Sequence, residues 1–233
     1  MSNRPVKKGD LGKTHENRTK KSSPYLIGSK KIGKPYLIIC EGEVTEPIYF
    51  EAIAGPNVQV AAKGYGRSKT ALVDRALKHC TDNKIDQAKT SIWVVFDFDV
   101  KYDQISNQKE DYNEAIVRAK RLGFEVAHSN DCFELWLVLH LKAIQGELHR
   151  TQLFEYLTQH FGENYEKLGK NRDWWLDKVS KWKSDPKVDT GMAMKRAIEL
   201  DNEHSGKPFA DQNPVTLVYQ LANELNPEMF PKN

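Results

Sequence analysis

The sequence has few cysteines and no long hydrophobic run, and these two features limit the kinds of protein that it can encode. Its 233 residues include only three cysteines, Cys40, Cys80 and Cys132, which lie far apart in apolar segments. This arrangement matches neither a disulfide framework nor zinc-ligand spacing, so we expect reduced core residues. No apolar run approaches the roughly 20 residues that cross a bilayer, and the N-terminus shows no hydrophobic signal core. We therefore expect a soluble, cytoplasmic protein with no membrane partner.

Positive charge is concentrated at the start of the chain. Residues 1–34 hold ten Lys and Arg residues against two acids, a local charge of +8; the whole chain carries +3, so the remainder carries −5. A basic arm of this kind can lie along phosphates, or it can be a solubilising tail. We predict a flexible basic arm over residues 1–34, with nucleic acid as its candidate partner.

Short apolar segments alternate with segments of helical periodicity in the first part of the chain. The runs at residues 37–40 and 92–96 are apolar without alternation, which indicates strands buried on both faces. Two weaker strands are expected at residues 58–62 and 124–128. Parallel neighbours need crossover connections, which the intervening helices provide. We predict an α/β fold over residues 35–141, a parallel sheet of about four strands flanked by helices.

The pattern becomes helical from residue 142 onward. Helices are expected at residues 151–161, 174–182, 192–202 and 215–225. We predict that residues 142–233 form a helical C-terminal subdomain packed on the α/β domain. Within the α/β domain, residues 100–111 are polar without periodicity and are predicted to be a long loop. Helices are expected after it at residues 112–122 and 132–141.

Three carboxylates follow the two most apolar strands. Glu41 comes after the strand at residues 37–40, and Asp97 and Asp99 come after the strand at residues 92–96. Parallel strands end at one edge of a sheet, and residues i and i+2 of an extended chain share a side. Clustered carboxylates suit Mg²⁺ or Mn²⁺, which can polarise a phosphodiester and activate water. We predict Glu41, Asp97 and Asp99 as metal ligands; ordinary turn acids are the alternative.

Two further acids are candidates for the same edge. Glu46 is predicted to contact substrate, although it could instead complement the dipole of a helix that Thr45 caps. Glu134 is predicted as a fourth catalytic acid. It also stands three residues after Asp131, so a capping box is the alternative explanation.

Four residues that are not acids are also predicted to bind substrate. Lys63, Arg67 and Lys69 flank two glycines before an expected helix, a plausible phosphate cradle or an ordinary turn. Asn130 could position substrate or cap the helix that follows it.

Three sequence blocks carry a resemblance to a known family. The Glu41 and Asp97-x-Asp99 arrangement resembles the Toprim fold of topoisomerases, primases and small nucleases. More specifically, the segments CEGEVTEPIYF at residues 40–50, WVVFDFD at 93–99 and SNDCFELWLVLH at 129–140 resemble the signature blocks of the RloB-like family. The resemblance runs from about residue 34 to the helix at 215–225. Asp131 departs from it, because proline is expected at that position.

The resemblance implies a bacterial protein of antiviral defence, abortive infection or restriction that works with a partner ATPase. It implies a nuclease, a hydrolase that uses Mg²⁺ or Mn²⁺ to cut RNA or DNA, with RNA favoured. Glu41 would be a general acid or base, and Asp97 and Asp99 metal ligands. No domain for a topoisomerase tyrosine is evident in the sequence, which favours hydrolysis over strand passage.

Other functions remain open. Asp97-Phe-Asp99 also matches the nucleophile motif of haloacid-dehalogenase-type phosphatases, in which the first Asp attacks phosphorus. Those enzymes normally begin with this strand, whereas two βα units precede it here. Nucleotide-sugar transferases share the Asp-x-Asp pattern but would leave Glu41 without a role. A non-catalytic module that binds nucleic acid or a partner ATPase is the alternative of a different class.

Overall fold

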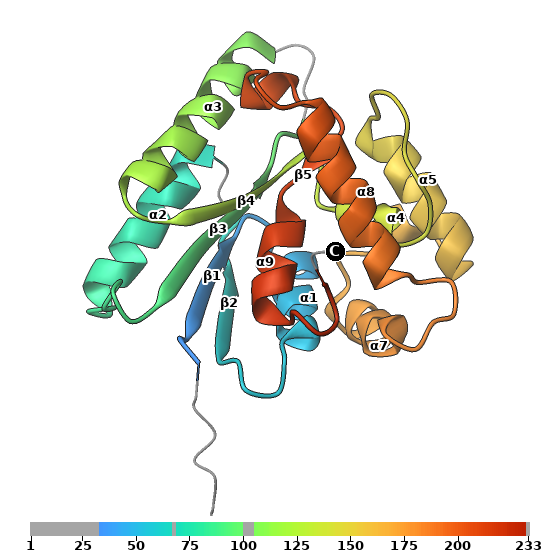
Figure 1. Ribbon diagram of the computed structural model, residues 1–233, viewed down its shortest axis with the longest axis horizontal. Helices are drawn as coiled ribbons and strands as arrows, with labels where there is room; N and C mark the ends of the chain where they lie inside the picture. The colour runs from blue at the N-terminus through green and yellow to red at the C-terminus, as the bar shows by residue number, and fades with distance from the viewer. Residues whose placement is uncertain (1–32, 67–68, 100–104, 232–233) are drawn as a thin grey trace, which may run out of the picture. The chain divides into compact units, whose positions relative to one another are not determined.

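A five-stranded sheet lies at the centre of the fold (Figure 1). The computed structural model describes residues 33–66, 69–99 and 105–231. The strand order is β2-β1-β3-β4-β5, in which the first four strands are parallel and β5 is antiparallel to β4. The strands are β1 (Tyr36–Cys40), β2 (Val60–Gly64), β3 (Ser91–Asp97), β4 (Glu125–Asn130) and β5 (Val215–Thr216). The predicted α/β class is confirmed.

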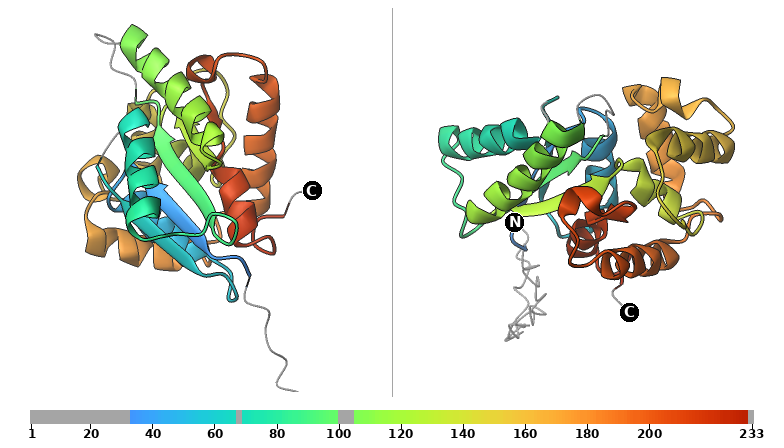
Figure 2. Two further views of the ribbon diagram at one scale, coloured as in Figure 1. Left: turned by 90° about the vertical axis from the view of Figure 1, so that its left-hand side faces the viewer. Right: turned by 90° about the horizontal axis from the view of Figure 1, so that it is seen from above.

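Helices cover both faces of the sheet, as the unbroken apolar strands predict (Figure 2). One face carries Leu37 and Ile39, which join a core with the buried sides of α2 and α3. The other face carries Ile38 and Cys40, which join a larger core with α1, α4, α7, α8 and α9. The helices are α1 (Thr45–Ile53), α2 (Lys69–Asp82), α3 (Ile105–Arg121), α4 (Glu134–Leu139), α5 (Arg150–Phe161), α6 (Tyr165–Leu168), α7 (Arg172–Trp182), α8 (Thr190–Glu203), the 3₁₀ turn η1 (Phe209–Asp211) and α9 (Val218–Leu225).

Helix α3 begins seven residues earlier than predicted, so the expected loop at residues 100–111 is wrong from Ile105 onward. Most residues of this first part are polar and at least partly exposed, and the buried side of α3 starts only at Tyr112. Hydrophobic periodicity therefore could not reveal it. The amide of Gln108 donates a hydrogen bond to the carbonyl oxygen of Asp99 (3.2 Å), which links this first part to the end of β3.

The C-terminal part of the chain joins the sheet as well as packing on it. Val215 and Thr216 pair with Asn130 and Ser129 on β4, where a helix was predicted to begin. A hydrogen bond between the hydroxyl groups of Ser129 and Thr216 (2.9 Å) supports this pairing. The sheet therefore has a fifth strand that the sequence pattern did not show. Residues 31–233 form one compact unit, and the predicted division at residue 142 falls within it.

The peptide bond between Asn130 and Asp131 is cis. Asp131 is the position at which the family resemblance leads us to expect proline, the residue before which cis bonds are commonest. The chain turns here from β4 toward α4.

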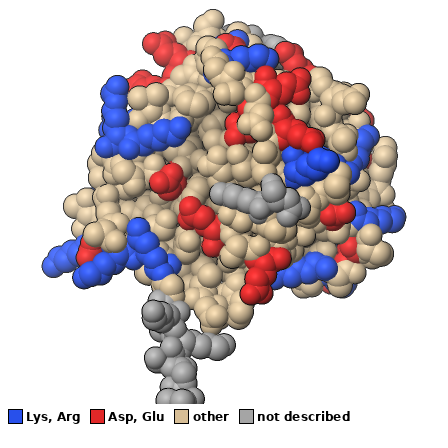
Figure 3. Space-filling model, viewed as in Figure 1, with Lys and Arg blue, Asp and Glu red and all other residues tan. Residues whose placement is uncertain are grey.

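Acidic and basic side chains are interspersed on the face of the molecule seen in Figure 3, among the residues drawn in colour. No helix within the described ranges is long and apolar enough to span a membrane. Of the predicted basic arm, residues 1–32 lie outside the described part of the chain.

His128 on β4 makes the stability of the fold sensitive to acid. Its side chain is fully buried, and its Nδ1 shares a hydrogen bond with the Tyr112 hydroxyl (2.9 Å). Burial, and to a lesser extent the charge of Lys120, lowers the pKa of His128 to about 3. The unfolded chain takes up the proton near pH 6.5, so this contribution to stability is present above that pH and is lost as the pH falls.

We predict that the free energy of unfolding of the wild type falls relative to that of His128→Gln by about 2 kcal/mol between pH 8 and pH 5. Urea unfolding of both proteins at each pH measures this difference. Groups that titrate in the same way in both proteins do not contribute to it. A difference that stays constant over this range contradicts the prediction.

Candidate active site

The ends of β1 and β3 bring Glu41 and Asp97 together, as their positions in the sequence predict. Cys40 at the end of β1 pairs with Val95 on β3, and the Glu41 amide donates to the Val95 carbonyl oxygen (2.8 Å). One carboxylate oxygen of Glu41 then accepts a hydrogen bond from the Asp97 amide (3.2 Å). The two acids therefore lie at one sheet edge although 56 residues separate them.

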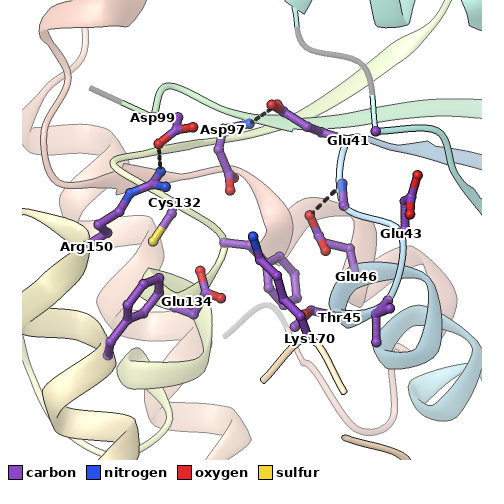
Figure 4. A pocket seen from close by; sticks show the side chains of 15 residues that line it. Glu41, Glu43, Thr45, Glu46, Asp97, Asp99, Cys132, Glu134, Arg150 and Lys170 are labelled. Atoms are coloured by element: carbon purple, nitrogen blue, oxygen red, sulfur yellow. Dashed lines mark hydrogen bonds and ion pairs between the residues drawn. The ribbon is translucent and has the colours of Figure 1, made fainter. Parts of the chain in front are cut away.

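A pocket of about 440 Å³ opens at this edge (Figure 4). Acidic side chains outnumber basic ones on its walls. The acids are Glu41, Glu43, Glu46, Asp97, Asp99 and Glu134, and the bases are Arg150 and Lys170. The acids come from the end of β3, from the segments that follow β1 and β3, and from α1 and α4, whereas both bases come from the C-terminal part of the chain.

Glu46 lies in the first turn of α1 and also faces the pocket. Its carboxylate is buried and accepts a hydrogen bond from the Gly42 amide (3.1 Å). A Cβ atom at Gly42 would lie 2.0 Å from a carboxylate oxygen of Glu46, so a side chain at this position would displace the acid. Thr45 does not cap the helix as predicted, because Val44 is the N-cap and the Thr45 hydroxyl donates instead to the Gly169 carbonyl oxygen (3.2 Å).

Asp97 is the centre of the acidic group. Burial raises the pKa of Asp97 well above its usual value, and the charges of Glu46, Glu41 and Glu134 raise it further. A hydrogen bond from the Phe133 amide acts in the opposite direction. Burial and the neighbouring charge of Glu134 likewise raise the pKa of Glu46 to about 7. The pKa of Glu41 is raised, mainly by burial.

Glu134 points toward the same acids and does not form a capping box. Phe133 is the N-cap of α4, and no side chain caps this helix. The Glu134 carboxylate instead accepts a hydrogen bond from the Tyr165 hydroxyl (3.0 Å). The capping explanation is therefore wrong, and Glu134 lies in the pocket at the start of a buried helix.

Asp99 lines the pocket but faces a basic partner. The strand ends at Asp97, and Asp99 has a φ of 55°, so the alternation of an extended chain does not apply to this pair. The Asp99 carboxylate forms an ion pair with the Arg150 guanidinium. The Arg150 amide also donates to the Asp131 carboxylate (2.9 Å). Periodicity in the sequence gave no signal for Arg150, because its place depends on how α5 packs.

The four other predicted binding residues lie in different environments. Lys63 is exposed on β2 and does not line the pocket. Lys69 is buried at the start of α2, and its charge lowers the pKa of Glu41, which places its ammonium group near that acid. Asn130 donates from its side-chain amide to the Ala210 carbonyl oxygen (3.1 Å) and is not a lining residue. Arg67 lies outside the described residues.

The side chains of this pocket offer mainly carboxylate oxygens to a cation. Carboxylate oxygens are the ligands that Mg²⁺ and Mn²⁺ prefer. Burial, together with the charges of neighbouring acids, raises the pKa of Glu46 and of Asp97, and a bound cation would favour their ionised forms. The side chains therefore fit such an ion in kind. Within the described ranges, however, no three His, Cys, Asp or Glu side chains already stand together as an ion-binding group.

Glu46 provides a test of the electrostatics of this pocket. A carboxyl whose pKa is raised in the folded state contributes stability at low pH and loses it as the pH rises through the folded pKa, here about 7. Glu46→Gln removes the charge and keeps an oxygen that can accept from Gly42. We predict that its free energy of unfolding rises relative to the wild type by about 2 kcal/mol between pH 5 and pH 8.

The matched control is Glu51→Gln, an exposed acid on the same helix. Denaturant unfolding at the two pH values should show almost no pH-dependent difference for this variant. If the difference in unfolding free energy between Glu46→Gln and the wild type is the same at both pH values, as expected for Glu51→Gln, the pKa of Glu46 is not raised in the folded protein.

Comparison with known proteins identifies the family of the chain. The model of the family described as RloB-like protein matches residues 36–225. No curated protein and no solved structure matches the chain. The matched segment runs from the first residue of β1 to the last residue of α9 and so includes every residue that lines the pocket. The chain belongs to the RloB-like family.

Proposed function

We propose that this protein is a nuclease that depends on Mg²⁺ or Mn²⁺ and hydrolyses phosphodiester bonds. The observation that carries the proposal is the position of Asp97, whose carboxyl faces the charges of Glu41, Glu46 and Glu134 in one pocket. Acids that repel one another in this way are stabilised by a bound cation. A Toprim-like assignment of the fold belongs to the same proposal.

The chain's own residues have distinct roles in this proposal. Asp97 and Glu41 would hold the ion, and Asp99, which Arg150 positions, would be the third ligand. Glu46 and Glu134, which line the same pocket, would be further oxygen donors. A bound divalent ion supplies a polarised phosphodiester and a more acidic water. Glu41 would also exchange a proton with the reacting oxygen as general acid or base.

The biological setting is also a proposal. An RloB-like nuclease in a bacterial cell would serve antiviral defence or restriction, with a partner ATPase that controls it. RNA is favoured over DNA as the substrate. Asp97→Asn would then abolish both cleavage and protection.

We predict that the purified protein cleaves RNA or DNA with Mg²⁺ or Mn²⁺ and not with EDTA. Asp97→Asn and Glu41→Gln should each lower the rate by a factor of about 100 or more, because each removes an oxygen ligand or the proton-transfer group. Gel assays with labelled RNA and DNA of one sequence measure the rates. Each reaction is run with the purified protein alone, and again with ATP and the proposed partner ATPase.

Exposed Glu51→Gln is the control variant and should cleave like the wild type. Melting temperatures near that of the wild type would show that the two site variants are folded. Equal cleavage by the wild type and Asp97→Asn would refute the catalytic assignment.

Two alternatives give different results in the same assays. A non-catalytic module would bind nucleic acid without metal-dependent cleavage under any of these conditions. A phosphatase of the haloacid dehalogenase type would release phosphate from a small aryl phosphate and leave internal phosphodiesters intact.

A further inference from the structure

The acidic pocket poses an electrostatic problem for the proposed substrate. Six carboxylates line it, and a nucleic acid carries one negative charge for each phosphate. A divalent ion neutralises only part of this excess. Any phosphate that enters therefore needs a basic side chain on the wall, and the lining provides two candidates, Arg150 and Lys170.

Arg150 is already committed to the protein. Its guanidinium forms an ion pair with Asp99 and lies 3.6 Å from the Asp131 carboxylate, measured from Nε. Its backbone amide donates to that same carboxylate. Two acids thus share its charge, which suits a role in positioning Asp99 rather than in binding an anion.

Lys170 differs from Arg150 in both its partners and its exposure. It lines the same pocket and is exposed. Among the residues that the structure describes, none forms an ion pair or a hydrogen bond with its ammonium group. In Figure 4 the side chain lies in front of the acids, between the labels of Glu134 and Glu46.

The backbone next to Lys170 is held by several contacts, whereas its side chain is exposed. The carbonyl oxygen of the preceding residue, Gly169, accepts a hydrogen bond from the Thr45 hydroxyl. The Gly169 amide donates a hydrogen bond to the Tyr165 carbonyl oxygen (2.7 Å). A Cβ atom at Gly169 would lie 2.8 Å from the Tyr165 ring, so this turn is closely packed. The Trp175 indole donates to the Thr45 carbonyl oxygen (2.8 Å).

These contacts attach the turn between α6 and α7 to the first turn of α1, which also carries Glu46. A lysine with a fixed backbone and a free ammonium group is suited to bind phosphate as a point charge. We propose that Lys170 contacts a phosphate of the nucleic-acid substrate, which makes it a substrate-binding residue. This inference rests on the proposed nuclease function and extends the site to the C-terminal part of the chain.

The test measures binding separately from cleavage. Every variant is made in the Asp97→Asn background, and its affinity for a short fluorescent single-stranded RNA, and for DNA of the same sequence, is measured by anisotropy with Ca²⁺. We predict that Lys170→Gln weakens binding about tenfold and lowers the salt slope by about 1, because one phosphate contact is lost. Lys170→Arg should restore most of the affinity.

The control is Lys167→Gln, an exposed lysine on α6 that does not line the pocket. It has the same charge and lies three residues away, so it reports the effect of charge alone. In the active protein, Lys170→Gln should raise KM more than it lowers kcat. The melting temperatures of all variants show whether they are folded.

Each outcome decides between the two claims. Unchanged affinity in Lys170→Gln, or an equal loss in Lys167→Gln, overturns the inference even if the wild type cleaves nucleic acid. Binding that depends on Lys170, without cleavage by the wild type, refutes the nuclease proposal and leaves the phosphate contact standing. Absence of binding to both RNA and DNA overturns the inference.

Discussion

Burial and mutual repulsion of the acids around Asp97 together form the constraint on which the rest of the site depends. Glu41 is held by the Asp97 amide, Glu46 by the Gly42 amide, and Asp97 by the Phe133 amide. Glu134 accepts from the Tyr165 hydroxyl. Hydrogen bonds from neutral donors orient these carboxylates without neutralising them, so a proton or a cation would stabilise the group.

The C-terminal part of the chain completes this arrangement. It supplies the hydroxyl of Tyr165, the guanidinium of Arg150 and the ammonium group of Lys170. It also adds β5 to the sheet beside β4. The sheet therefore provides the acids, and the helices that follow provide the groups that position or counter them. Within the first 141 residues, Lys69 is the base that the structure places near these acids.

The sequence predicted the parts of the site that follow from strand ends. Two unbroken apolar runs end on Glu41 and Asp97, and parallel pairing brings such ends to one edge. It could not predict the direction of Asp99, because φ changes sign after the strand. Arg150 and Lys170 lie on surface-like polar stretches, and only tertiary packing brings them to the pocket. The two-residue β5 is too short for any periodicity to reveal it.

The most direct test of this account is calorimetric titration with Mn²⁺ near neutral pH, in buffers that differ in ionisation enthalpy. If the crowded carboxyls hold a proton that the cation displaces, binding releases protons and the measured enthalpy depends on the buffer. Asp97→Asn should bind more weakly. Binding that is independent of the buffer, or no difference between the wild type and Asp97→Asn, would contradict the claim that repulsion around Asp97 creates the cation site.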